Sequence, residues 1–276
     1  MRASGNPAFR NLPRGSGNYV GFDPQAGTPG YGNYGQQPAY GGPAGPGGYG
    51  VAYQTSGAVG RPMTIDDVVT RTAMTLGLAL ITGILTLVTH AYWLALPAAL
   101  VGLVLAMIVI FKRTPNAALV LCYAGAEGIV LGAITELFDH IYPGIAFQAI
   151  AGTFGVFIAM LIVYKTGAIR VTPRLTKWII GATFGVLVVV LANFLIGMFG
   201  VNLGLRDGSP LSIVFSIVII GIAAFNLLLD FDQADRMIRA GYPAKWAWYA
   251  AFGLTVTLVW LYLEILRLLS YLQRGN

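Results

Sequence analysis

Five ionisable residues lie within or at the edges of long apolar stretches of this 276-residue sequence. They are Glu127, Glu136, Asp230, Glu264 and Arg267. An ionised group is costly in the hydrocarbon of a bilayer, so such residues usually face a polar cavity or a partner and mark the paths of ions or protons. Carboxylate oxygens suit hard cations, but calcium takes about six to eight oxygen ligands, which favours transient passage with water over a tightly bound metal.

Asp230 and Glu264 are the two carboxylates that we expect to act together. Asp230 ends the apolar run 211–230, and Glu264 lies near the middle of the last run, which extends from Leu254 to Leu272. At about 1.5 Å of rise per residue, Glu264 would lie close to the bilayer midplane. Two carboxylates drawn together cannot both ionise easily and titrate as a unit, so this pair is predicted to form a proton-operated gate.

All four carboxylates also have a structural interpretation. Asp230 is consistent with a helix-end carboxylate in interfacial water, paired with Arg236, and Glu264 with a local ion pair to Arg267 one turn later. Glu127 and Glu136 are candidate pore carboxylates, but a hydrogen-bonded structural carboxyl explains Glu127 equally well, and a solvated loop charge explains Glu136 better. Gly-x-x-x-Gly spacing, which permits close helix approach, occurs at Gly128 and Gly132 and again at Gly181 and Gly185.

Enzyme motifs are not found in the sequence. It has no nucleophile elbow, no His-Glu-x-x-His zinc helix and no phosphate loop. The single cysteine, Cys122, excludes an internal disulfide and a cysteine zinc site. An aspartyl hydrolase would want two aspartates close together, and Glu264 beside Arg267 suits that poorly. We therefore expect no enzymatic activity, no cofactor and no tightly bound metal.

The composition indicates that a membrane positions these residues. Hydrophobic residues make up 56% of the chain and charged residues 10%, and the mean hydropathy is +0.70. Soluble domains carry about 25% charged residues, so a soluble enzyme is excluded. A spanning helix needs about 20 mainly apolar residues, and seven runs qualify: 72–91, 93–111, 117–138, 145–164, 177–199, 211–230 and about 250–272. The sequence predicts an all-α polytopic membrane protein with seven transmembrane helices.

The first 60 residues differ from the rest and hold 16 of the 36 glycines and 7 of the 14 prolines. Such a composition cannot bury enough apolar surface to offset chain entropy. We predict a disordered cytoplasmic tail over 1–62 and a transmembrane domain over 63–276. With the N-terminus in the cytoplasm, 14 of the 17 Lys and Arg residues fall on that side and the C-terminus lies outside. The positive charge therefore favours anionic lipid as a partner, and not nucleic acid.

Three segments, in order along the chain, resemble the Bax inhibitor-1 family, also called transmembrane Bax inhibitor motif proteins. Residues 123–132 are similar to its Glu-Gly-x-x-Leu-Gly stretch, 229–233 to its Tyr-Asp-x-x-Gln segment, and 261–269 to its Leu-Tyr-Leu-Asp-x-x-Asn-Leu-Phe signature. The resemblance covers about 65–272 and leaves out the tail, which resembles that of a bacterial branch of the family.

The resemblance implies a seven-helix bundle whose last helix is central, in a bacterial inner membrane. It also implies a pH-sensitive calcium leak gated by the carboxylates of Asp230 and Glu264, with calcium as the transported ion. An arginine at the inner end of the second helix latches the closed form in the family, and here Lys112 or Arg113 would match it.

This sequence departs from the family pattern at the gate. The seventh helix carries Glu264 in place of Asp, and Arg267 in place of Asn. Arg267 would disable the pair if it points at Glu264 and leave it free if it points outward. If the last helix entered the membrane at Trp246, Glu264 would lie about 27 Å deeper, beyond reach of Asp230. The pair therefore depends on residues 244–252 staying at or beyond the cytoplasmic face.

A second function is consistent with the same sequence. The chain would then be a membrane regulator, for example of a membrane protease or of a stress response, that binds a membrane-protein partner through its tail and inner loops. The carboxylates would be structural in that case.

Overall fold

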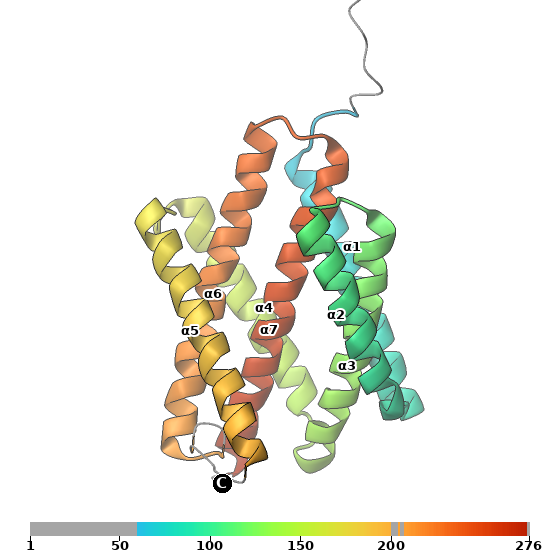
Figure 1. Cartoon of the computed structure of the whole chain (residues 1–276), viewed down its shortest axis with the longest axis vertical. Helices are drawn as coiled ribbons and strands as arrows, with labels where there is room; N and C mark the ends of the chain where they lie inside the picture. The colour runs from blue at the N-terminus through green and yellow to red at the C-terminus, as the bar shows by residue number, and fades with distance from the viewer. Residues whose placement is uncertain (1–59, 200–203, 205–206, 275–276) are drawn as a thin grey trace, which may run out of the picture. The chain divides into compact units, whose positions relative to one another are not determined.

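The computed structural model describes residues 60–199, 204 and 207–274 (Figure 1). This part of the chain forms seven α-helices: α1 (Ile65–Thr89), α2 (Ala95–Lys112), α3 (Ala117–Ile141), α4 (Ile145–Thr166), α5 (Pro173–Met198), α6 (Pro210–Arg239) and α7 (Ala247–Arg274). Short 3-10 turns, Tyr92–Leu94 and Ala244–Trp246, precede α2 and α7. All seven are long and apolar enough to cross a bilayer, which confirms the predicted fold class.

Three helices begin earlier than their apolar runs because polar caps fix their first turns. Thr64 and Asp67 form a capping box at the start of α1, in which each side chain accepts a hydrogen bond from the other residue's backbone N–H. Thr172 caps α5 and Ser209 caps α6. A proline follows each of these two caps, and its fixed φ suits the first helical position.

The sixth helix is longer than the apolar run 211–230 that predicted it, because α6 continues to Arg239. Two ion pairs spaced four residues apart stabilise the added turns, Asp232 with Arg236 and Asp235 with Arg239, each at 2.5 Å. Asp230 is therefore nine residues from the end of its helix. Arg236, the partner that the helix-end interpretation offered for Asp230, pairs with Asp232 instead.

Helix α7 lies at the centre of the bundle, as predicted (Figure 1). It packs against α1, α3, α4 and α6 and is the most buried of the seven. Helices α1 and α3 also approach each other closely, because a Cβ on Gly128 or Gly132 would overlap the backbone of α1. This confirms the Gly-x-x-x-Gly prediction for that pair. At Gly181 and Gly185 the prediction is wrong, since a Cβ there would meet nothing within 4 Å in the described structure.

Candidate functional site

Asp230 lies against α7 and is held by a threonine of that helix. The Thr257 hydroxyl donates a hydrogen bond of 2.6 Å to its Oδ2. One turn earlier on α7, Gly253 also faces the carboxylate, because a Cβ at this position would lie 3.6 Å from Oδ1, in ordinary van der Waals contact. Asp230 is therefore level with the Gly253–Thr257 turn of α7.

A small cavity adjoins this carboxylate. Its volume is about 110 Å³, and its lining includes Asp230, Gln233, Tyr249 and Gly253. A single water needs roughly 10–15 Å³ of such space, so there is room for several. The arrangement can therefore hold water, or a partly hydrated cation, next to a carboxylate inside a membrane-spanning helix.

Glu264 lies elsewhere on α7 and has a different partner. Its side chain is 3% exposed, and its Oε1 is 2.7 Å from Nη1 of Arg267. Seven residues separate it from Thr257, which corresponds to about 10 Å along the helix axis. The structure therefore does not bring Asp230 and Glu264 into contact. The physical reason is that α7 is helical from Ala247 onward, so its first two turns pack beside α6 and move Glu264 deeper.

The two cations expected to latch the gate lie at the end of α2. Lys112 is the last residue of α2, and Arg113, with φ of 44°, ends that helix. Both are exposed, and neither forms an ion pair with Asp230 in the described part of the chain. Arg267 points at Glu264, which is the arrangement that would disable a gating pair. The local ion pair is thus the interpretation of Glu264 that the structure matches.

Glu127 and Glu136 both lie between α3 and a neighbouring helix. The Oε1 atom of Glu127 faces Gly102 of α2, where a Cβ would approach to 3.7 Å. Glu136 is 2.5 Å from Nδ1 of His90, at the end of α1. The two glutamates therefore belong to the α2–α3 and α1–α3 contacts respectively.

One comparison with known proteins identifies the family. A family model described as Bax inhibitor 1 like matches residues 6–274. The chain belongs to the Bax inhibitor 1-like family. The match begins at residue 6, so it takes in most of the predicted tail, which the resemblance noted above had left out. A search of curated protein sequences gave no match. Together with the seven apolar helices, family membership establishes a multi-pass membrane protein.

This Bax inhibitor 1-like chain holds α7 by hydroxyl contacts that the sequence analysis missed. Besides the Thr257–Asp230 bond, the hydroxyl oxygen of Thr255 lies 2.9 Å from that of Thr75 in α1. The hydroxyl oxygen of Tyr262 lies 2.7 Å from that of Thr135 in α3. Side-chain hydrogen bonds of this kind join helices within membranes. Three neighbours are thus fixed in register with α7. The only signal in the sequence is that α7 carries polar residues within an apolar run, and this does not identify their partners.

A second missed feature is a clasp, formed by residues 61–71 on the α6–α7 connection. The Arg61 guanidinium donates to both Asp67 carboxylate oxygens, at 2.6 and 2.9 Å. Arg71 lies 3.7 Å from the same carboxylate, donates to the Ala244 carbonyl, and sits 5.5 Å over the Trp248 ring. The backbones are joined as well: the Met63 N–H donates to the Tyr242 carbonyl, and the Ala244 N–H donates to the Arg61 carbonyl. Arg61 and Pro62, which we had assigned to the tail, thus belong to the bundle, whereas residues 1–59 of the predicted tail lie outside the described residues.

Proposed function

We propose that this Bax inhibitor 1-like protein is a passive cation leak, with calcium as the transported ion and Asp230 as its proton sensor. One observation carries the proposal: a carboxylate nine residues inside a membrane-spanning helix adjoins a cavity that can hold several waters. An ionisable group in such a position is functional by default. Protonation removes its charge, and with it the attraction for a cation.

Glu264 has a different part in this proposal from the one predicted. About 10 Å from the level of Asp230, it would be a second position along the path and not half of a contacting pair. Its ion pair with Arg267 would have to open before a cation could replace the guanidinium. Asp230 therefore responds directly to pH, whereas Glu264 acts only after a rearrangement of α7.

We further propose that the α6–α7 connection faces the cytoplasm of a bacterial inner membrane. The positive charges support this orientation, because Arg61, Lys112, Arg113, Lys165 and Lys245 all lie in or beside connections at that end of the bundle.

The test is calcium flux into liposomes that hold the purified full-length protein, scanned over about pH 5 to 8, where buried carboxylates can change charge. Asp230→Asn is compared with Asp232→Asn, which makes the same chemical change two residues along α6. We expect pH-dependent flux in the wild type and in Asp232→Asn, and a flat profile in Asp230→Asn.

Two results would count against the proposal. Wild-type profiles in Asp230→Asn would remove Asp230 as the sensor. No flux at any pH, from protein that is folded and inserted, would reject the leak altogether. The regulator function would then be tested by co-purification of partners with and without residues 1–60.

A further inference from the structure

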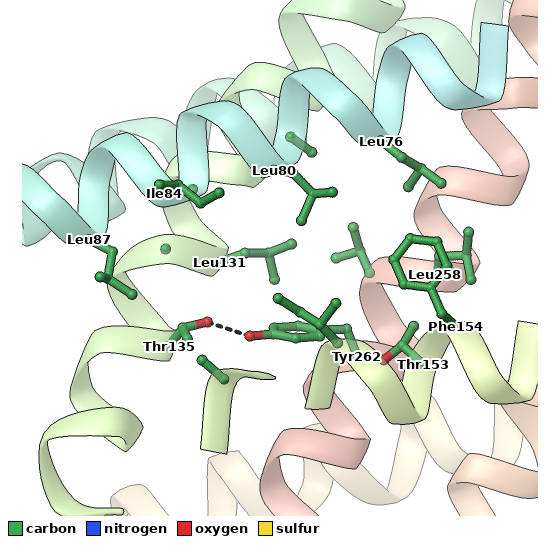
Figure 2. A pocket seen from close by; sticks show the side chains of 16 residues that line it. Leu76, Leu80, Ile84, Leu87, Leu131, Thr135, Thr153, Phe154, Leu258 and Tyr262 are labelled. Atoms are coloured by element: carbon green, nitrogen blue, oxygen red, sulfur yellow. Dashed lines mark hydrogen bonds between the residues drawn. The ribbon is translucent and has the colours of Figure 1, made fainter. Parts of the chain in front are cut away.

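A second and larger pocket lies between α1, α3, α4 and α7 (Figure 2). Its volume is about 190 Å³. A row of α1 side chains from Leu76 to Leu87 forms one side, and the first half of α4 contributes residues from Ala146 to Phe154. Helices α3 and α7 complete the wall with Leu131, Thr135, Leu258 and Tyr262, among others. The proposed leak makes no use of this space.

Each hydroxyl of the pocket wall already has a hydrogen-bond partner. Thr135 and Tyr262 are hydrogen-bonded to each other at 2.7 Å, which Figure 2 shows as a dashed line. The Thr153 hydroxyl donates to the carbonyl of Ala149, also at 2.7 Å. All other lining side chains are apolar or absent. A polar solute or a water cluster would therefore find few groups to bind, and the chemistry of the wall favours a hydrocarbon.

The pocket is continuous with the lipid-facing surface of the bundle. Helices α1 and α4 both pack on α7 and scarcely on each other, so a space remains between them. Two of the lining side chains, Ile84 of α1 and Phe154 of α4, are 60% and 42% exposed. Because both helices span the membrane, the medium at these side chains is the hydrocarbon of the bilayer. What enters the pocket from the side is therefore lipid.

We propose that this pocket binds one acyl chain of a bilayer phospholipid. An apolar cavity of about 150 Å³ stays dry and takes up a benzene-sized molecule. The larger pocket here has room for several methylene groups of a chain. These groups would make the dispersion contacts that the lining side chains lack when the pocket is empty. Acyl chains also make up the hydrocarbon that surrounds the whole bundle. This inference does not depend on the proposed leak.

The test uses nanodiscs that hold the full-length protein and a phosphatidylcholine with a photoreactive diazirine midway along one chain. Irradiation labels the side chains within reach, and mass spectrometry locates them. Thr153 and Tyr262 are the reporters, because they are 8% and 9% exposed and are reached only by a chain inside the pocket. We expect both to be labelled in the wild type.

Two α4 variants provide the matched comparison. Ala146→Phe fills the pocket, whereas Ala151→Phe adds the same ring at an exposed position outside it. Labelling of Thr153 and Tyr262 should fall about tenfold in Ala146→Phe, equivalent to about 1.4 kcal/mol of lost binding. It should stay at the wild-type level in Ala151→Phe. Leu80→Phe, which fills the pocket from α1, should behave as Ala146→Phe does if the latter does not fold.

The proposal is overturned if neither reporter is labelled in the wild type while exposed Ile84 is. It is also overturned if labelling is equal in the filled and control variants, since the label would then have reached these residues without occupying the pocket.

Discussion

The hydroxyl of Thr257 donates a 2.6 Å hydrogen bond to the carboxylate of Asp230, and this contact shows how α6 and α7 are aligned. With Thr257 opposite Asp230, Glu264 lies two helical turns away and pairs with Arg267 instead. The two acidic residues that the sequence motifs single out therefore occupy separate environments. One adjoins a cavity with room for several waters, and the other is buried beside a permanent cation.

Replacing Thr257 should affect both stability and pH dependence. Thr257→Val removes the donor but keeps the shape, and a hydrogen bond to a charged acceptor contributes about 1.5–3 kcal/mol. We expect a lower thermal unfolding midpoint in nanodiscs and a displaced midpoint of the flux-against-pH curve. Thr257→Ser keeps the hydroxyl and should preserve the pH curve. If valine and serine give the same curve, the hydrogen bond has no influence on the sensor.

The ion pair on α7 should show energetic coupling between its members. Substitution of Arg267 with Gln removes the guanidinium that lies 2.7 Å from the Glu264 carboxylate. We expect a loss of about 2 kcal/mol, less than the roughly 3–5 kcal/mol of a fully buried pair, because Arg267 is partly exposed. Glu264→Gln in the same protein should restore part of that loss.

The check is a double-mutant cycle on unfolding free energies, where residues in direct contact couple by about 0.5–3 kcal/mol. Additive losses from the two single variants would show that the pair contributes nothing to stability. The same set also tests the function, since opening the pair should raise calcium flux if Glu264 is a second position on the path.

Hydropathy was enough to predict the seven helices, because the length of an apolar run is set by the thickness of the bilayer. Their ends were less predictable. Helix α6 continues past Asp232 because ion pairs four residues apart stabilise it, although these residues resemble a polar loop in a hydropathy profile. Helix α1 begins at Ile65 because Thr64 and Asp67 cap it, which a search for apolar runs ignores.

The alignment of α6 with α7 could not be predicted at all. Motifs placed Asp230 and Glu264 on the correct helices, but the level of one against the other depends on where α7 starts and on side-chain packing between the helices. The clasp was hidden for a similar reason. Its members, Arg71 and Ala244, are 173 residues apart in the sequence. No local pattern reports such a contact.

Because α1 and α3 approach each other closely, we predict that a larger residue at Gly132 destabilises the protein. Gly132→Ala would place a Cβ against the backbone of Gly83, so the helices must separate. Overpacking of this kind costs about 1–3 kcal/mol. Gly155→Ala on α4 is the control, because a Cβ there meets nothing within 4 Å. It should be neutral, or stabilising by up to about 1 kcal/mol from helix propensity. Equal unfolding midpoints for the two variants would contradict the close contact.

The clasp predicts that two neighbouring aspartates of α1 differ sharply. Asp67 completes the capping box with Thr64 and is ion-paired to Arg61, whereas Asp66, beside it, is exposed. Asp67→Ala should destabilise the protein by about 1 kcal/mol or more, the usual cost of losing a cap. Asp66→Ala makes the same change in charge and should leave stability within about 0.5 kcal/mol of the wild type.

Hydrogen exchange locates the effect of the Asp67 substitution. If the clasp holds the α6–α7 connection, Asp67→Ala should speed exchange of the Ala244 amide, which donates to the Arg61 carbonyl. Asp66→Ala should not. Faster exchange confined to the first turn of α1 would mean that Asp67 is only a helix cap, and that the connection is held by its own contacts.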